Sequence, residues 1–126
     1  MKLLGLNLTV LVVFTLMVVL GCGNTNEHHA YLEVTFKNAS NERINEAAVR
    51  FGKYRCTAGT IIPGVGATHL DWRPPVGTNA IVEWRDSKQA KQEALVSLAG
   101  IYDPTVEGRL IFSVGPTNVT VSFKRR

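Results

Sequence analysis

Hydrophobic and polar residues follow two different patterns along the chain. Between Leu3 and Leu20 there is no charged residue, and Leu, Val, Phe and Met dominate the run. From Leu32 onward, apolar and polar residues alternate with a period of two in several short segments. This alternation is typical of β-strands that bury one face. The pattern therefore predicts an apolar leader followed by an all-β domain.

Five segments carry the alternation clearly and two carry it less clearly. The clear segments are residues 32–37, 47–51, 80–85, 109–114 and 119–124, and the others are residues 54–58 and 67–72. Clusters of Gly, Pro, Asn and Ser, which favour turns, separate them. Short strands at this spacing predict a single small antiparallel β-sandwich of about 7–8 strands over residues 31–126, after an N-terminal hydrophobic signal helix.

Residues 87–98 fit two patterns. Their apolar side chains match a helix face at one spacing, and Ala94, Val96 and Leu98 match a strand face at the other. Intrinsic propensity favours a helix. Residues 86–88 have the composition of a hairpin turn, and a sandwich has a place for the returning strand. We expect a strand, with the helix as the alternative.

The apolar leader has the features of an export signal. Lys2 precedes it, and the small and polar residues 21–26 end it. This charge pattern places the rest of the chain outside the cytoplasm. Because the run is also just long enough to cross a bilayer, a retained transmembrane helix is the alternative.

The end of the leader, Val19-Leu20-Gly21-Cys22, resembles the lipobox of bacterial lipoproteins. The resemblance implies that a signal peptide, residues 1–21, is removed after recognition of Val19, Leu20 and Gly21. It also implies that the Cys22 thiol is alkylated by a diacylglycerol donor and that Cys22 becomes the first residue of the mature protein. Two or more acyl chains give stable anchoring, at about 0.8 kcal/mol per buried methylene.

The residues after Cys22 predict where the anchored protein resides. Gly23 stands where an aspartate would signal retention in the inner membrane of many Gram-negative bacteria. The lipoprotein resemblance therefore implies an outer-membrane location facing the periplasm. Residues 22–30 show no apolar periodicity and are expected to form a tether of at most roughly 30 Å. His28 and His29 lie in it without a third ligand nearby, so we expect solvated residues and no metal site.

Composition and charge narrow the range of partners. The chain has 45% hydrophobic and 19% charged residues, which suits a folded domain. Its formal net charge is +4, but the basic residues of the expected domain are scattered, apart from the C-terminal Lys124-Arg125-Arg126. No basic stripe with stacking aromatic residues is visible, so we expect no nucleic-acid partner. Phosphate-binding glycine loops and metal-spaced histidine clusters are also missing, so we expect no cofactor.

Cys56 is the only cysteine after Cys22. It has no partner for a disulfide within the domain, and a lone thiol in the envelope is expected to be buried. The alternative is a thiol hydrolase in which Cys56, His69 and Asp71 act as nucleophile, base and orienting group. No flanking sequence matches a catalytic turn, so we expect a non-enzymatic protein.

The two tryptophans have different expected roles. Trp84 alternates with Ala80 and Val82 and is expected to anchor the core. Trp72 follows a strand end in Asp-Trp-Arg-Pro-Pro and is a candidate ligand contact, for a sugar or a protein partner. A tryptophan that caps the end of the sandwich is the alternative.

The strand pattern resembles the immunoglobulin-like or transthyretin-like sandwiches of bacterial envelope proteins. From an anchor and a small sandwich without catalytic motifs, we expect a membrane-anchored, non-enzymatic envelope lipoprotein that binds another protein or assists an envelope assembly. The alternatives are an immunity or inhibitor protein against a periplasmic toxin, a carbohydrate-binding module that uses Trp72, and a thiol enzyme that uses Cys56.

Overall fold

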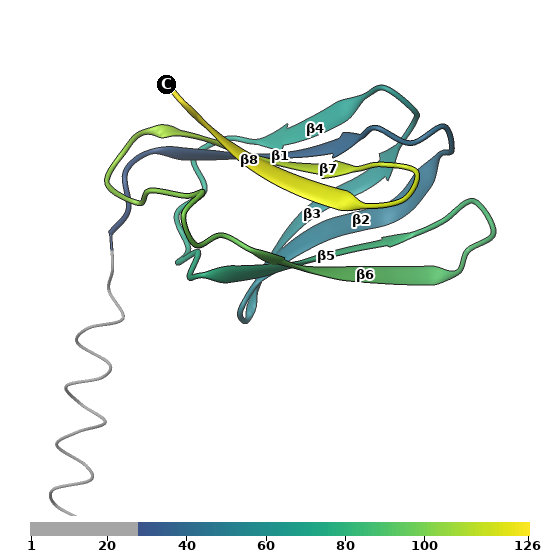
Figure 1. Cartoon of the computed structure of the whole chain (residues 1–126), viewed down its shortest axis with the longest axis horizontal. Helices are drawn as coiled ribbons and strands as arrows, with labels where there is room; N and C mark the ends of the chain where they lie inside the picture. Colours follow the sequence, from purple (N-terminus) through teal and green to yellow (C-terminus); the bar gives the residue numbers. More distant parts are fainter. Residues whose placement is uncertain (1–27) are drawn as a thin grey trace, which may run out of the picture.

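Residues 28–126 are described by the computed structural model, and within them the chain forms eight strands (Figure 1). The strands are β1 (Leu32–Asn38), β2 (Ile44–Phe51), β3 (Tyr54–Ile61), β4 (Gly66–His69), β5 (Asn79–Arg85), β6 (Lys91–Ser97), β7 (Gly108–Val114) and β8 (Val119–Arg125). No helix in this part of the chain is long and apolar enough to cross a bilayer. The expected signal helix and the Val19–Cys22 lipobox lie outside the described residues.

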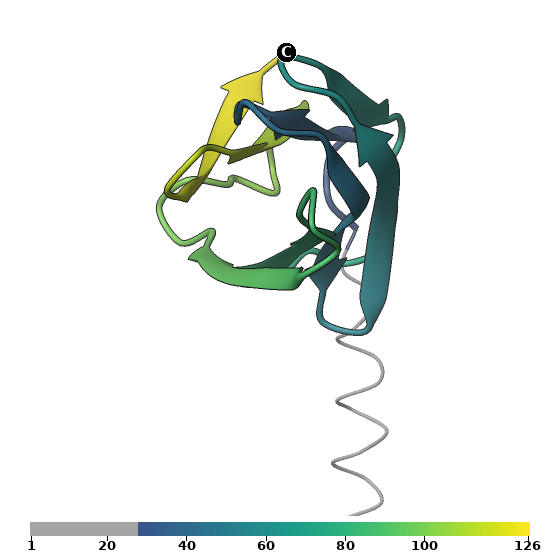
Figure 2. The same ribbon diagram turned by 90° about the vertical axis from the view of Figure 1, so that its right-hand side faces the viewer.

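The strands form two sheets of four that pack face to face. One sheet has the order β4-β1-β7-β8 and the other the order β3-β2-β5-β6. Figure 2 shows the two layers, with β6 and β8 on one side of the sandwich and β3 and β4 on the other. The predicted all-β sandwich is therefore confirmed.

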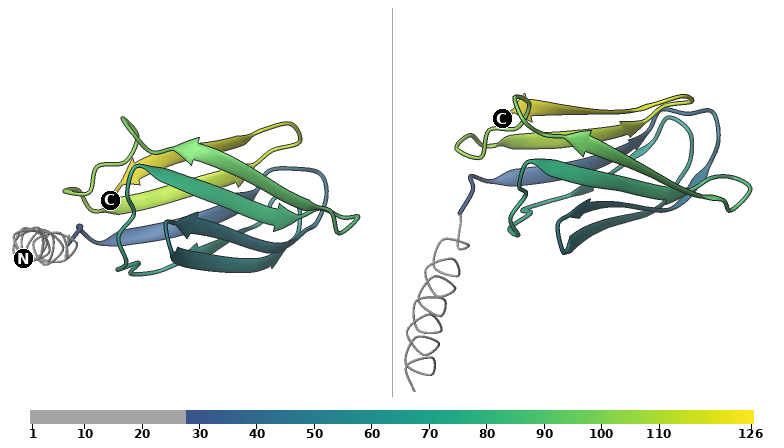
Figure 3. Two further views of the ribbon diagram at one scale, coloured as in Figure 1. Left: turned by 90° about the horizontal axis from the view of Figure 1, so that it is seen from below. Right: turned by 60° about the horizontal axis from the view of Figure 1, so that its bottom comes forward.

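One strand pair departs from the antiparallel pattern. β1 and β7 run parallel, with Leu32 opposite Gly108 and Asn38 opposite Val114, while all the other pairs of residues 28–126 are antiparallel. The reason is the path of the chain. β6 ends where β1 begins, so β7 starts at that end and must run in the same direction as β1. Figure 3 shows the start of β1 and the C-terminus together at this end.

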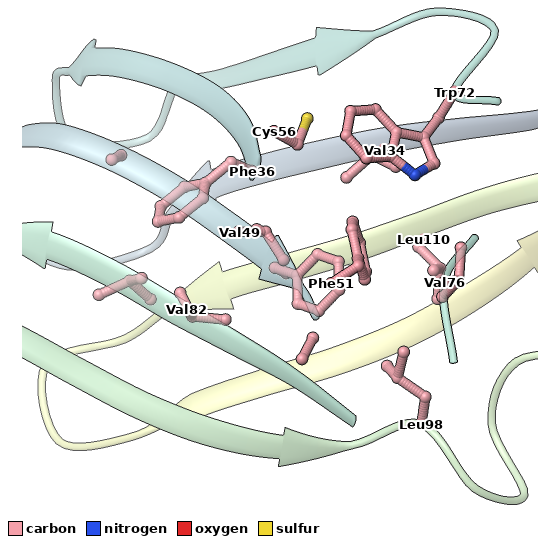
Figure 4. Packing of buried hydrophobic residues seen from close by; sticks show 14 of the residues in the cluster. Val34, Phe36, Val49, Phe51, Cys56, Trp72, Val76, Val82, Leu98 and Leu110 are labelled. Atoms are coloured by element: carbon pink, nitrogen blue, oxygen red, sulfur yellow. The ribbon is translucent and has the colours of Figure 1, made fainter. Parts of the chain in front are cut away.

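The core lies between the inward faces predicted by the alternation. Phe36, Phe51 and Phe112 are among its largest fully buried side chains, and the rings of Phe51 and Phe112 meet edge to face with centroids 5.9 Å apart. Val82 and Leu110 extend the same cluster (Figure 4). Because these residues come from both sheets, burying them holds the layers together.

Residues 91–97 form strand β6, which confirms the expected strand and excludes the helix. Each residue of β6 pairs with one of β5, from Asn79 opposite Ser97 to Arg85 opposite Lys91. The Asp86 carboxylate closes the preceding turn by accepting hydrogen bonds from the backbone N–H groups of Lys88 and Ala90, both at 2.9 Å. Cross-strand pairing outweighs the helical propensity of the segment.

The predicted strand over residues 67–72 ends early, at His69. Asp71 adopts a positive φ of 54°, which turns the chain out of the extended path. The backbone N–H of Trp72 then donates to the carbonyl of Leu32 at 2.8 Å, outside the ladder. This turn carries the Trp72 side chain toward the core.

Candidate functional site

Trp72 is buried, so the predicted ligand contact at this residue is wrong. Its side chain is only 6% exposed, and its ring packs against Phe51 and His69 with centroid distances of 5.6 and 5.2 Å. Figure 4 shows the indole among the core side chains. Its ring leaves no free face for a sugar, and the residue caps the end of the core, as in the alternative prediction.

Trp84 is more exposed than the sequence predicted, whereas Trp72 is more buried. It lies on the inward face of β5, as predicted, and packs against the core cluster, but it remains half-buried. The cause is its position. Trp84 pairs with Gln92 of the edge strand β6, where the second sheet covers the inward face only in part. The residue with the partly exposed ring is therefore Trp84 rather than Trp72.

Cys56 is buried and has no disulfide partner within residues 28–126, as expected. It lies on the inward face of β3 beside a small cavity of about 100 Å³, which His69 also lines. Burial among apolar side chains raises the pKa of the Cys56 thiol. The thiol is therefore held in its protonated, less nucleophilic form.

The three residues of the alternative thiol site are not joined by hydrogen bonds in the described part of the chain. His69 is exposed and meets the Trp72 ring edge-on. The Asp71 carboxylate accepts from Nε and Nη2 of Arg73, at 3.1 and 3.0 Å. Cys56 and His69 line one cavity, but the carboxylate that would orient the histidine is bound to Arg73. The arrangement lacks the relay that activates a thiol.

The chain enters the sandwich through a docked segment. His29 Nε2 lies 3.0 Å from the carbonyl oxygen of Pro74, and the backbone N–H of Ala30 donates to Pro104 at 2.8 Å. The expectation that His29 is a solvated tether residue is therefore wrong, whereas His28 is exposed. Contacts with the domain therefore begin at residue 29, two residues before the predicted start of the domain at residue 31. They form because the backbone carbonyls of Pro74 and Pro104, in two loops at this end, accept hydrogen bonds from the segment.

A cleft of about 780 Å³ lies beside the docked segment. Val76, Leu98 and Tyr102 form part of its wall, and His28 and His29 also line it. The Tyr102 hydroxyl is buried without a hydrogen-bond partner in residues 28–126. Burial, together with the nearby charge of Asp103, raises the pKa of Tyr102 to about 12. The cleft is mainly apolar and has the size of a small-molecule pocket.

The two sheets close over each other unevenly. On the β3–β4 side, the strands are joined directly by a turn. On the opposite side, β6 and β8 are edge strands whose inward side chains are only half-buried. The half-buried inward residues of these two strands are Gln92, Ala94, Val96, Val119, Val121 and Phe123. We refer to this side, with its two strand edges, as the β6–β8 side.

Glu83 forms a buried charge cluster that the alternation did not reveal. It lies on the outward face of β5 yet is only 7% exposed. Arg55 Nη2 lies 2.9 Å and Arg50 Nε 3.6 Å from its carboxylate oxygens. Arg50 comes from β2, which is next to β5, and Arg55 comes from β3, the strand beyond β2; together they cover the carboxylate. A period-two pattern cannot predict this cover, because it depends on which strands are neighbours.

The end of the sandwich near the C-terminus carries further charged groups. Arg109 Nη2 lies 2.7 Å from Glu33, and its hydrogen bond to that carboxylate holds the pKa of Glu33 below its usual range. The Arg126 guanidinium lies 4.9 Å from the centre of the Tyr31 ring. Lys124 and Arg125 form no ion pair within residues 28–126. Two positive charges thus lie at the end of β8 outside any such ion pair, although the charge of Arg125 contributes, after the hydrogen bonds from Thr105, to lowering the pKa of Asp103.

Comparison with known proteins supports the fold alone. No protein-family model matches the chain, and no curated protein matches it. One structural match is an NMR structure of a protein from Eubacterium rectale, at 11% sequence identity and a TM-score of 0.50. The match covers 76% of this chain and 90% of that one.

Proposed function

We propose that the chain is a membrane-anchored lipoprotein of the bacterial envelope whose β-sandwich binds another protein and catalyses no reaction. The lipid is carried on Cys22, and the anchored domain faces the periplasm from the outer membrane. The domain acts as an accessory module, and its sandwich supplies the binding surface.

The half-covered β6–β8 side is the observation that carries the protein-binding part of the proposal. Apolar inward residues of both edge strands remain partly exposed there, next to two long strand edges. Apolar surface gathered in this way is typical of contact with another macromolecule.

The position of the docked segment is consistent with anchoring. Six residues, 23–28, separate Cys22 from His29, and they span at most about 21 Å. An anchor at Cys22 therefore keeps the end of the domain that holds Pro74 and Pro104 near the bilayer. The length of the β6–β8 side runs away from that end, so a partner can reach it.

Two of the three alternative functions, carbohydrate binding and thiol catalysis, gain no support from the geometry. A carbohydrate-binding role was expected to use Trp72, and this ring is buried in the core. A thiol enzyme was expected to use Cys56, and burial raises the pKa of this thiol. An inhibitor of a periplasmic toxin remains a special case of protein binding, in which the partner is the toxin.

Anchoring is tested by intact-mass measurement of the chain purified from bacterial membranes. We expect a mass that begins at Cys22 and includes acyl groups, and we expect the Cys22→Ser variant to lose both the acyl groups and the cleavage. A mass that includes residues 1–21 without an acyl adduct would refute the anchoring proposal.

Protein binding is tested by photo-crosslinking in cells. A photoreactive amino acid replaces Val96 on the β6–β8 side, and in a matched control it replaces Thr57, which is exposed on the outward face of β3. We expect a discrete crosslinked protein from position 96 and none from position 57. Equal labelling from both positions, or none from position 96, would contradict the proposed binding surface.

A further inference from the structure

The register of β7 and β8 determines which backbone groups of β8 are free. The backbone N–H of Arg126 donates to Glu107 at 3.0 Å, and the N–H of Gly115 donates to Asn118 at 2.8 Å. Both contacts belong to one unbroken antiparallel register, in which hydrogen-bonded pairs alternate with non-hydrogen-bonded pairs. The backbone groups of alternate β8 residues therefore point toward β7, and those of the residues between them point away.

The residues before Lys124 whose backbone points away from β7 are Val119, Val121 and Phe123. Their N–H and C=O groups lie along the outer edge of β8, where no strand of residues 28–126 pairs with them. The same three residues carry the half-buried inward side chains of β8. Backbone donors and acceptors and apolar side chains thus lie together along one edge.

Over residues 119–123, this edge has none of the usual devices that block strand addition. β8 pairs with β7 over seven residue pairs without a bulge, and it contains no proline and no charge before Lys124. β4, the other edge of the same sheet, has only four residues. β6 carries Lys91 and Glu93 along its edge. An uninterrupted, regular edge strand is a template for pairing with another chain.

The charges at the end of β8 indicate what kind of added strand can pair with its free edge. Lys124 and Arg125 stand exposed at the end of β8 and form no ion pair in the described part of the chain. In an antiparallel pair, the first residues of an added strand lie opposite them. If β8 paired with β8 of a second copy about Val121, these two positive charges would face Asn118 and Thr117 and meet no carboxylate. An acidic segment of a different protein satisfies them better than a second copy does.

We infer that the free edge of β8 accepts, as an added antiparallel strand, an extended segment of a partner protein that begins with acidic residues and continues with alternating apolar residues. This inference rests on the proposed protein-binding function and names the mode of binding. Main-chain hydrogen bonds supply the affinity, while the apolar and acidic side chains supply the specificity.

The test uses the full chain and a fluorescent peptide, Glu-Glu-Val-Thr-Val-Thr-Val, followed by fluorescence anisotropy. Its glutamates lie opposite Arg125 and Lys124, and its valines lie opposite Phe123, Val121 and Val119. We expect binding to the unmodified chain. The same peptide with N-methyl groups on its first two valines cannot donate to the β8 edge, and we expect its affinity to fall at least tenfold.

Protein variants locate the peptide. Val121→Lys places a charge on the inward side of the free edge and is expected to weaken binding at least tenfold. Leu95→Lys, on the β6 edge, is the matched control and is expected to change it less than twofold. Lys124→Glu is expected to weaken binding about two- to fivefold, the size of one cross-strand charge pair, and to favour a peptide that begins with two lysines.

Three outcomes would overturn the inference. The first is equal binding of the plain and N-methylated peptides, a result that does not depend on how well any variant folds. The second is loss of binding in Leu95→Lys but not in Val121→Lys, which would place the peptide on β6. The third is a dimer of the unmodified chain that Val121→Lys dissociates, which would make a second copy the occupant. If position 96 still yields its crosslinked protein in the Val121→Lys chain, protein binding stands and only the strand-addition mode fails.

Discussion

Replacing Trp72 with alanine tests whether this residue belongs to the core. The side chain is only 6% exposed, and a buried tryptophan removes about 150–250 Å² from water. At about 25 cal/mol per Å², this burial corresponds to about 4–6 kcal/mol. Measured large-to-small changes of this kind cost about 3–5 kcal/mol. We therefore expect Trp72→Ala to lower the free energy of unfolding by about 4 kcal/mol, a large share of the stability of a small domain.

The assay is urea denaturation followed by far-ultraviolet circular dichroism, which does not depend on tryptophan fluorescence. With a slope of about 1–3 kcal/mol per M, the midpoint is expected to fall by about 2 M. Trp84→Ala is the matched control, and because Trp84 is half-buried it is expected to cost about half as much. A larger loss for Trp84→Ala than for Trp72→Ala would refute the reasoning.

A milder change at the same position separates packing from hydrogen bonding. The indole N–H of Trp72 is buried without a partner within residues 28–126. Trp72→Phe removes this donor, whose burial costs about 1–3 kcal/mol, and keeps most of the ring contact with Phe51. We expect a loss below about 1.5 kcal/mol for Trp72→Phe, from the same denaturation curves. A loss as large as that of Trp72→Ala would show that the N–H has a partner.

Four further measurements test individual residues. Asn38→Ala is expected to lower the free energy of unfolding by about 2–4 kcal/mol in urea denaturation. The reason is that Nδ2 of this fully buried residue donates to the carbonyls of Glu42 and Ile61, at 2.7 and 2.9 Å. A loss under about 1 kcal/mol would contradict this prediction. Gly108→Ala is expected to cost about 1–3 kcal/mol by the same method, since its Cβ would lie 2.6 Å from the Lys124 carbonyl oxygen, and an unchanged midpoint would refute this. In absorbance titration at 295 nm, one tyrosine ionisation is expected at about pH 12, and the Tyr102→Phe variant is expected to lack it. Cys56, in the full chain carrying Cys22→Ser, is expected to react with a thiol reagent only after unfolding, and rapid reaction of the native protein would show the thiol to be accessible.

The raised pKa of Tyr102 also makes the stability of the fold depend on pH. The folded-state pKa of Tyr102 is about 12, above its ordinary value of 10.0. The folded state therefore holds the phenol proton more tightly than the unfolded state does. The stabilisation is fully present below about pH 10 and is lost as the pH rises through about 12. Tyr102→Phe should flatten this part of the stability profile.

Strands with strict alternation were predictable from the sequence because the cause of the pattern is local. In β1 and β7, every second residue is apolar apart from Asn38, and the structure buries all the residues of this face. For residues 91–97, local propensity and pairing point to different structures. Only the neighbouring strand β5 decides between them, so prediction there depended on recognising the turn at Asp86.

Candidate site residues were harder to predict because exposure depends on distant parts of the chain. The sequence around Trp72 has the composition of a loop, but the positive φ at Asp71 turns the indole into the core. Trp84 has the pattern of a core residue, but it lies beside an edge strand. Neither the turn nor the edge position is visible in a window of a few residues.

By itself, the sequence determined most of the strand segments and their inward faces, since each depends on residues close together in the chain. Only the tertiary structure decided that β1 pairs with β7 in parallel, that two arginines cover Glu83, and that β8 keeps a free edge. These features join strands that are far apart in sequence. Their formation depends on the order of strands across each sheet, which the alternation of side chains along a single strand does not encode.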